Sequence, residues 1–123
     1  MSSNSEFALI TKSKDLCTYI LTVTQNSPKK FRFTLTSRIQ NLSLDILQTI
    51  FKANEIRLSN NSLCRLEFQR EALISLKMLS FICNLATEQK CILVKQFEHI
   101  SSLIHDCQYL IFAWIKNDSK RKF

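Results

Sequence analysis

The chain has 123 residues, no glycine, one proline and a formal net charge of +7 at pH 7. This length fits one domain with a single hydrophobic core. Tight hairpin turns depend on glycine, asparagine and aspartate, so the composition argues against a β-rich fold and favours long helices joined by short connections. The positive charge is compatible with nucleic acid or another acidic partner, although many small proteins are basic.

Five cysteines are spread along the chain without a CxxC pair, and their number is odd. They are typical of small buried hydrophobic residues in a reducing compartment and predict neither a disulfide framework nor a zinc site. The first residues lack a charged segment followed by an apolar one, which argues against a secretory signal peptide. Because no run of about 18 uncharged apolar residues occurs, we expect no membrane span and a cytoplasmic protein.

A first helix is expected from roughly Glu6 to Gln25, with Ser5 as its N-cap and residues 1–5 frayed. Its apolar positions recur at helical spacing: Leu9, Leu16, Ile20 and Val23. We expect the helix to end before Pro28, because proline disfavours helical geometry in the residue that precedes it.

The next segment alternates three cations with two aromatic rings: Lys29, Lys30, Phe31, Arg32 and Phe33. One interpretation is a loop that contacts phosphates and offers stacking groups to bases. The alternative is a connector whose phenylalanines plug the end of a helical bundle while the charges stay in water. We favour the plug for the phenylalanines and leave both interpretations open for the cations.

The second helix is expected to be capped by Thr34 or Thr36 and to end near Arg57. Its apolar residues follow steps of three and four, which place them on one face: Leu35, Ile39, Leu42, Ile46, Ile50 and Ala53. Flanking apolar residues widen this face, so the helix needs more than one partner helix. Residues 58–62 are expected to form a polar connection.

A third helix is expected from roughly Leu63 to Thr87, and residues 72–86 are apolar on nearly all of its sides. A helix that is apolar all round has to be buried all round. In a four-helix bundle each helix normally keeps one face in water, so the excess predicts a subunit interface that includes Leu79, Phe81 and Ile82. The alternative is the central helix of a larger monomer, but the rest of a 123-residue chain offers little to cover it.

The fourth helix is expected from about Leu93 to Lys116, and residues 117–123 form a polar, basic tail that we expect to fray. Its apolar face also follows steps of three and four: Phe97, Ile100, Ile104, Cys107, Ile111 and Trp114. Four helices with short links predict an all-α, antiparallel up-down-up-down four-helix bundle, in one domain that spans residues 1–123.

The sequence offers little for catalysis. His99 and His105 lie six residues apart, a spacing poorly suited to one metal ion on a helix. Cys107 falls on the apolar face, which is typical of a core thiol and not of a nucleophile. Glycine-rich phosphate loops are excluded because the chain has no glycine. We therefore expect no enzymatic activity, no metal and no cofactor.

Cations are the remaining candidates for function. We assign a candidate nucleic-acid-binding role to nine of them: Lys29, Lys30, Arg32, Arg38, Lys52, Arg57, Arg65, Arg70 and Lys77. Lys52 and Arg57 have an alternative explanation, because cations near a helix C-terminus stabilise the helix dipole. In a ring of identical subunits each of these charges would be repeated around the ring.

Two segments resemble the Avd-type proteins, which are accessory variability determinants of diversity-generating retroelements. The segment PKKFRFTLTSRIQNLSLDILQTIFKA is similar to the start of their second helix and matches at Pro28, Arg32, Phe33, Leu35, Arg38, Ile39, Gln40, Asp45 and Leu47. The segment VKQFEHISSLIHDCQYLIFAWIKN is similar to their last helix and matches at Lys95, Gln96, Phe97, Glu98, Leu103, Trp114, Ile115 and Lys116. Related four-helix-bundle proteins encoded in ribosomal-RNA intervening sequences share this architecture.

The resemblance implies a four-helix bundle that assembles as a homopentamer with a central channel. It also implies a basic surface that binds RNA or DNA, and a partner reverse transcriptase whose mutagenic cDNA synthesis the protein supports. The chain departs from the family where arginines, a capping serine and glycines are usual, at Ser80, Cys83, Asn84, Leu93, Phe112 and Ala113. The competing hypothesis is a protein-interaction or structural module of the same fold that does not bind nucleic acid.

Overall fold

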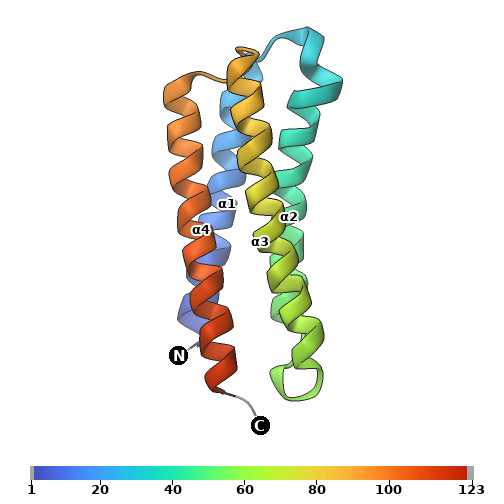
Figure 1. Cartoon of the computed structure of the whole chain (residues 1–123), viewed down its shortest axis with the longest axis vertical. Coiled ribbons are helices and arrows are strands. Elements are labelled where there is room, and N and C mark those ends of the chain that lie inside the picture. The colour runs from blue at the N-terminus through green and yellow to red at the C-terminus, as the bar shows by residue number, and fades with distance from the viewer. Residues whose placement is uncertain (1, 122–123) are drawn as a thin grey trace.

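The computed structural model describes the backbone of residues 2–121 and the side chains of residues 6–58 and 63–121. Throughout this part of the chain the long elements are helices: α1 (Ser2–Val23), α2 (Ser37–Glu55), α3 (Leu58–Glu88) and α4 (Val94–Lys120). They run alternately up and down, and each packs against its neighbours in the chain, with α4 closing the bundle against α1 (Figure 1). The predicted four-helix bundle is therefore confirmed.

The core lies along the bundle axis, where the inward faces of all four helices meet. The helical spacing on α2 and α4 is confirmed, because buried residues recur at steps of three and four on both. The largest buried side chains come from every helix: Leu9, Leu16, Ile20, Ile39, Ile46, Ile50, Leu76, Leu79, Ile100, Ile111 and Trp114.

Three helices are longer than the sequence predicts. Ser5 lies inside α1, which begins at Ser2, so the predicted N-cap at Ser5 is wrong. Residues 58–62 form the first turn of α3 and not a polar connection, which leaves only Ile56 and Arg57 between α2 and α3. Helix α4 continues to Lys120, four residues beyond the predicted end. A polar composition does not exclude a helical end, since terminal turns have their free backbone groups in water.

The connection between α1 and α2 is a chain of short helical turns. Two 3₁₀ turns, Thr24–Asn26 and Lys29–Phe31, precede a π-helical turn, Arg32–Thr36. No side chain caps α2, so the predicted caps at Thr34 and Thr36 are wrong. Side-chain caps are not needed here, because the helical backbone already begins at Arg32. Its carbonyl groups accept the hydrogen bonds of the first N–H groups of α2.

A buried charge cluster joins the other end of the bundle. The guanidinium group of Arg65 donates from Nε to Asp118 Oδ2 (2.7 Å) and from Nη2 to Asp118 Oδ1 (3.0 Å). It also donates to Glu6 Oε1 (3.0 Å) and to the carbonyl oxygen of Ile56 (3.1 Å). Gln69 Nε2 donates to Asp118 Oδ2 (2.9 Å), so the cluster links α1, α3, α4 and the end of α2.

This cluster corrects the role predicted for Arg65. Its side chain and that of Asp118 are each only 8% exposed, and the guanidinium group lies 5.0 Å from the centre of the Trp114 ring. A cation that is buried and already paired is not available to a phosphate group in solvent. Arg65 therefore belongs to the core of the bundle and not to a binding surface.

We predict that Asp118→Ala lowers the free energy of unfolding by about 3 kcal/mol, because it leaves the Arg65 guanidinium buried with an incomplete set of partners. The matched control is Asp106→Ala, which removes the ion pair with Lys12 (3.4 Å), whose two side chains are each 43% exposed. The control should lose less than about 1 kcal/mol. Urea denaturation followed by circular dichroism measures both losses, and equal losses would contradict the structural role of the cluster.

Candidate functional site

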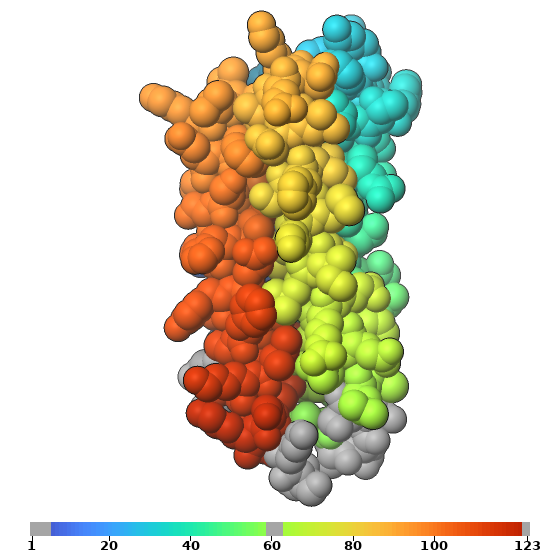
Figure 2. Space-filling model, viewed as in Figure 1, coloured from blue at the N-terminus to red at the C-terminus, as the bar shows by residue number. Residues whose placement is uncertain are grey.

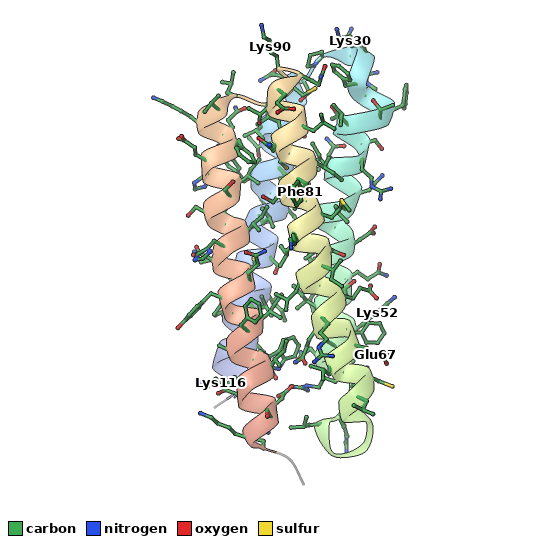
Figure 3. All side chains as sticks on the ribbon, viewed as in Figure 1. Lys30, Lys52, Glu67, Phe81, Lys90 and Lys116 are labelled. Atoms are coloured by element: carbon green, nitrogen blue, oxygen red, sulfur yellow. The ribbon has the colours of Figure 1, made fainter. Side chains whose placement is uncertain are left out.

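Two connections far apart in the sequence meet at one end of the bundle. The α1–α2 connection and the α3–α4 connection lie together there, and Figure 3 shows Lys30 and Lys90 at this same end. A hydrogen bond joins them, since the Ser27 hydroxyl donates to the carbonyl oxygen of Cys91 at 2.8 Å. Residues 27–38 and 89–95 therefore form one continuous surface.

This end of the molecule is strongly positive. It carries six exposed cations, which we call the basic end: Lys29, Lys30, Arg32, Arg38, Lys90 and Lys95. The only acidic residues in the adjoining helical turns of the described chain are Glu88 and Glu98. No ion pair within the described residues involves any of the six cations, so their charge faces solvent. Such a surface attracts polyanions.

The two phenylalanines of the α1–α2 connection have different environments. Phe31 packs against the core, and Lys30 Nζ lies 5.2 Å from the centre of its ring. The predicted plug is therefore confirmed for Phe31. For Phe33 it is wrong, because the π-helical turn places this side chain outside the bundle, where it is 88% exposed. An exposed aromatic ring offers a face on which a base can stack.

Lys90 and Lys95 were not among the predicted binding residues. Lys90 has a positive φ of 63° and ends α3, where Cys91 N–H donates to the carbonyl oxygen of Ala86 at 2.8 Å. This pattern is a Schellman-type ending, usually made with glycine at the left-handed position. The predicted topology could have indicated these two residues, because in an up-down bundle the first and third connections lie at the same end.

The other predicted cations lie elsewhere. Lys52, Arg57 and Arg70 belong to the opposite half of the bundle, where Glu55, Glu67 and Glu71 are interspersed. Figure 3 shows Lys52, Glu67 and Lys116 toward that end. Lys52 Nζ lies 6.0 Å from the centre of the Phe68 ring. Lys77 lies midway along α3. The structure thus brings together four of the nine predicted cations and separates the other five.

The three predicted interface residues on α3 differ in their exposure to solvent. Leu79 is 0% exposed and lies in the core, so it is not a surface residue, and Ile82 packs partly against the core. Phe81 is 65% exposed and is labelled on α3 in Figure 3. Figure 2 shows that the outer surface of α3 lies on the face of the molecule toward the viewer, beside α4. It belongs to a row of exposed apolar residues at steps of four, three and four, which we call the α3 stripe: Ile74, Met78, Phe81 and Leu85.

Four of the five cysteine thiols lie in the core and do not form a reactive site. Cys17, Cys83, Cys91 and Cys107 are buried, and burial raises the pKa of each thiol, to about 12 for Cys83 and about 11 for Cys107. These thiols stay protonated near neutral pH, and the thiolate is the nucleophile. Within the described residues no three potential metal ligands of the His, Cys, Asp or Glu type come together.

We predict that only Cys64, the one exposed cysteine, reacts rapidly with a thiol reagent in the folded protein. The four buried thiols should react only after denaturation, because they are both inaccessible and protonated. Absorbance of the released chromophore counts the thiols in each phase. Cys64→Ser should abolish the rapid phase, and a second rapid thiol in that variant would contradict the packing described for the core.

Comparison with known protein families identifies the family of the chain. The family model described as bAvd-like matches residues 7–117, which include all of the basic end and most of the four helices. No curated protein and no solved structure gives a significant match to the chain. Among the described helices, none combines the length and apolar character that a membrane crossing requires.

Proposed function

Because the chain belongs to the bAvd-like family, we propose that it is a non-catalytic accessory protein of a diversity-generating retroelement. In this role it binds RNA or DNA and a reverse transcriptase in the cytoplasm and supports mutagenic cDNA synthesis. It requires no cofactor for this role, since its contribution is to hold the template and the polymerase.

The basic end carries the nucleic-acid part of this proposal. Six exposed cations from the two connections and the adjoining first turns of α2 and α4 face solvent, with only Glu88 and Glu98 nearby in the described chain. Cations on a surface of this kind bind phosphates without reading sequence, and binding releases counterions. The exposed Phe33 ring adds a stacking group that any base can use. Such binding suits a protein that acts on a template of varying sequence.

The α3 stripe carries the assembly part of the proposal. Four exposed apolar side chains in one row on a small protein form a patch of the kind that marks a protein contact. We propose that it lies between subunits of a homopentameric ring. Cyclic symmetry repeats the basic end once per subunit, so weak phosphate contacts add up along one nucleic-acid strand.

The same stripe is the observation that favours the second candidate function. A bundle that uses its α3 stripe only to bind other proteins, with an incidental positive charge, would be a structural module of the retroelement. The two functions differ in their response to salt, because only phosphate binding weakens steeply as the salt concentration rises.

We predict that replacing Lys30, Arg32 and Lys90 together by alanine weakens binding of single-stranded RNA and lowers the salt slope of log K by about 2, the value for three lost phosphate contacts. The matched control removes three cations from the opposite half, Lys52, Arg57 and Lys116. It should keep the slope almost unchanged. Fluorescence anisotropy over a salt series measures both. A larger change in the control would move the binding surface to the other end.

For the assembly, we predict that Ile74→Glu and Phe81→Glu each convert the ring into 14.4 kDa monomers, because a charge in an apolar contact lacks a partner there. Tyr109→Glu is the control, since Tyr109 is also exposed but lies on α4 away from the α3 stripe. Light scattering gives the mass of each variant. Unchanged mass in both α3 variants would show that the stripe is not the subunit contact.

A further inference from the structure

The α1–α2 connection enters α2 through a turn that is wider than an α-helical turn (Figure 1). In the π-helical turn Arg32–Thr36, the N–H of Ser37 donates to the carbonyl oxygen of Arg32, five residues earlier. Such turns are rare and are often found at functional sites. The Thr36 hydroxyl is buried here without a hydrogen-bond partner among the described residues, which costs stability. A gain in stability therefore does not explain this turn.

The wide turn changes the directions of Arg32 and Phe33. In an uninterrupted α-helix, residues seven apart lie on the same face. Arg32 would then share the face of Ile39, which is 0% exposed, and its charge would point into the core. Phe33 would share the face of Gln40, which is half-buried and donates from Nε2 to the hydroxyl oxygen of Thr24 (2.8 Å). With the π-helical turn, both side chains face solvent instead.

Phe33 is surrounded by cations and not by other exposed apolar residues. It is 88% exposed, and within residues 24–43 it is the one large hydrophobic side chain that faces solvent. Four cations of the basic end belong to the same segment, and residues 16–44 contain no Asp or Glu. A protein contact would require a patch of several apolar side chains. A single ring among cations instead matches an unpaired base with phosphates on both sides.

We propose that the π-helical turn makes the basic end selective for unpaired strands, with Phe33 stacking on a base of any identity. Arg32 and Arg38, which precede and follow the ring in the chain, contact the adjoining phosphates. This inference rests on the nucleic-acid binding proposed above and names its substrate class. In a duplex each base is already stacked on its neighbours, so the ring has no accessible face to bind and only the phosphate contacts remain.

The test uses three probes that all carry phosphates but differ in their accessible bases. They are a single strand of about ten nucleotides, the same strand without its bases, and a closed circular duplex that has no free ends. In fluorescence anisotropy, with the duplex measured by competition, wild-type protein should bind the normal strand about tenfold more tightly than the abasic strand. Phe33→Ala should remove this difference. It should leave the salt slope and the affinities for the other two probes unchanged, because it removes no charge.

Two further variants separate the aromatic ring from its apolar character. Phe33→Trp should keep the preference for the normal strand, whereas Phe33→Leu should lose it, because leucine is apolar but has no ring. Phe112→Ala is the matched control and should keep the preference, since Phe112 is also exposed but lies on α4. These are surface substitutions, so the fold should be retained, and circular dichroism checks this.

Several results would overturn the assignment of Phe33 and leave the proposed function standing. Equal binding of the normal and abasic strands by wild-type protein would show that no base stacks on the ring. Equal weakening of strand and duplex in Phe33→Ala, or full preference in Phe33→Leu, would show that the ring does not select unpaired bases. A lower assembly mass in Phe33→Ala would make the ring a protein contact. If none of the three probes binds at low salt, the proposed function itself is wrong.

Discussion

The buried pair of Arg65 and Asp118 fixes the arrangement on which the rest of the molecule depends. These residues lie 53 positions apart and join the start of α3 to the end of α4, and Glu6 ties α1 to the same guanidinium group. If α4 slid by one residue along α3, both charges would stay buried and lose each other, and breaking a buried pair costs about 3–5 kcal/mol. The apolar core alone tolerates such shifts better, because it is less directional. The ion pair therefore sets the register of α3 and α4 at one end of the bundle. Because both helices are rigid, the same register fixes where the α3–α4 connection lies at the other end.

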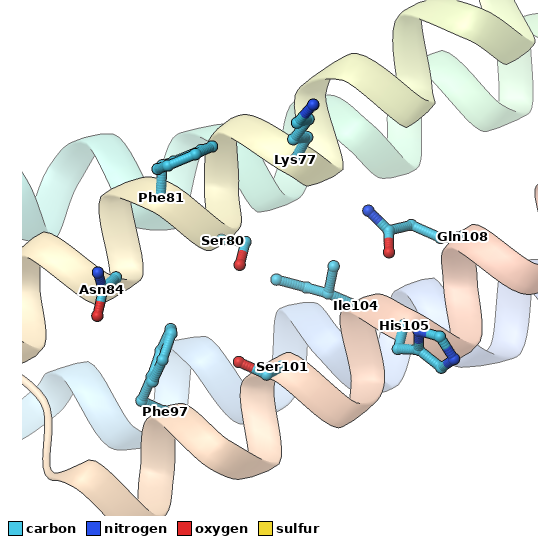
Figure 4. Close-up of a pocket in the computed structure, with 9 residues that line it drawn as sticks. All are labelled: Lys77, Ser80, Phe81, Asn84, Phe97, Ser101, Ile104, His105 and Gln108. Carbon is cyan, nitrogen blue, oxygen red and sulfur yellow. The ribbon is translucent and has the colours of Figure 1, made fainter.

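That register also determines which residues lie together at the opposite end. The α1–α2 and α3–α4 connections lie at the same end of the bundle, where the Ser27 hydroxyl donates to the backbone carbonyl oxygen of Cys91. The α1–α2 connection supplies three of the six cations, and the start of α2 supplies Arg38. Lys90 comes from the α3–α4 connection and Lys95 from the start of α4. No single segment holds this charge, and only the fold assembles it. The middle of the bundle carries charges of both signs and, between α3 and α4, a groove of about 460 Å³ (Figure 4). The excess of positive charge is therefore greatest at the basic end.

The spacing of apolar residues was enough to predict the four helices and their inward faces, because burial repeats with the helical turn. The spacing of apolar residues could not predict the pairing of Arg65 with Asp118. A charged residue among polar and apolar neighbours gives no indication of its partner on a distant helix. Phe31 and Phe33 show a second limit. Both follow a cation in the sequence, so their local patterns look alike. The π-helical turn gives them different directions, and Phe31 packs against the core while Phe33 faces solvent. Lys90 and Lys95 were missed because their role depends on the meeting of two connections and not on a local motif. Helix ends were missed where polar residues continue a helix without a change of spacing.

Hydrogen–deuterium exchange of the protein with and without a short single-stranded RNA at low salt tests the central claim most directly. The account predicts slower exchange on RNA binding in residues 27–38 and 89–97, and smaller changes in the remainder of the described chain. Slower exchange confined to residues 52–70 and 116–121 would contradict it, because the nucleic acid would then bind the end that holds the buried ion pair. No change in any segment under these conditions would contradict the binding of nucleic acid altogether.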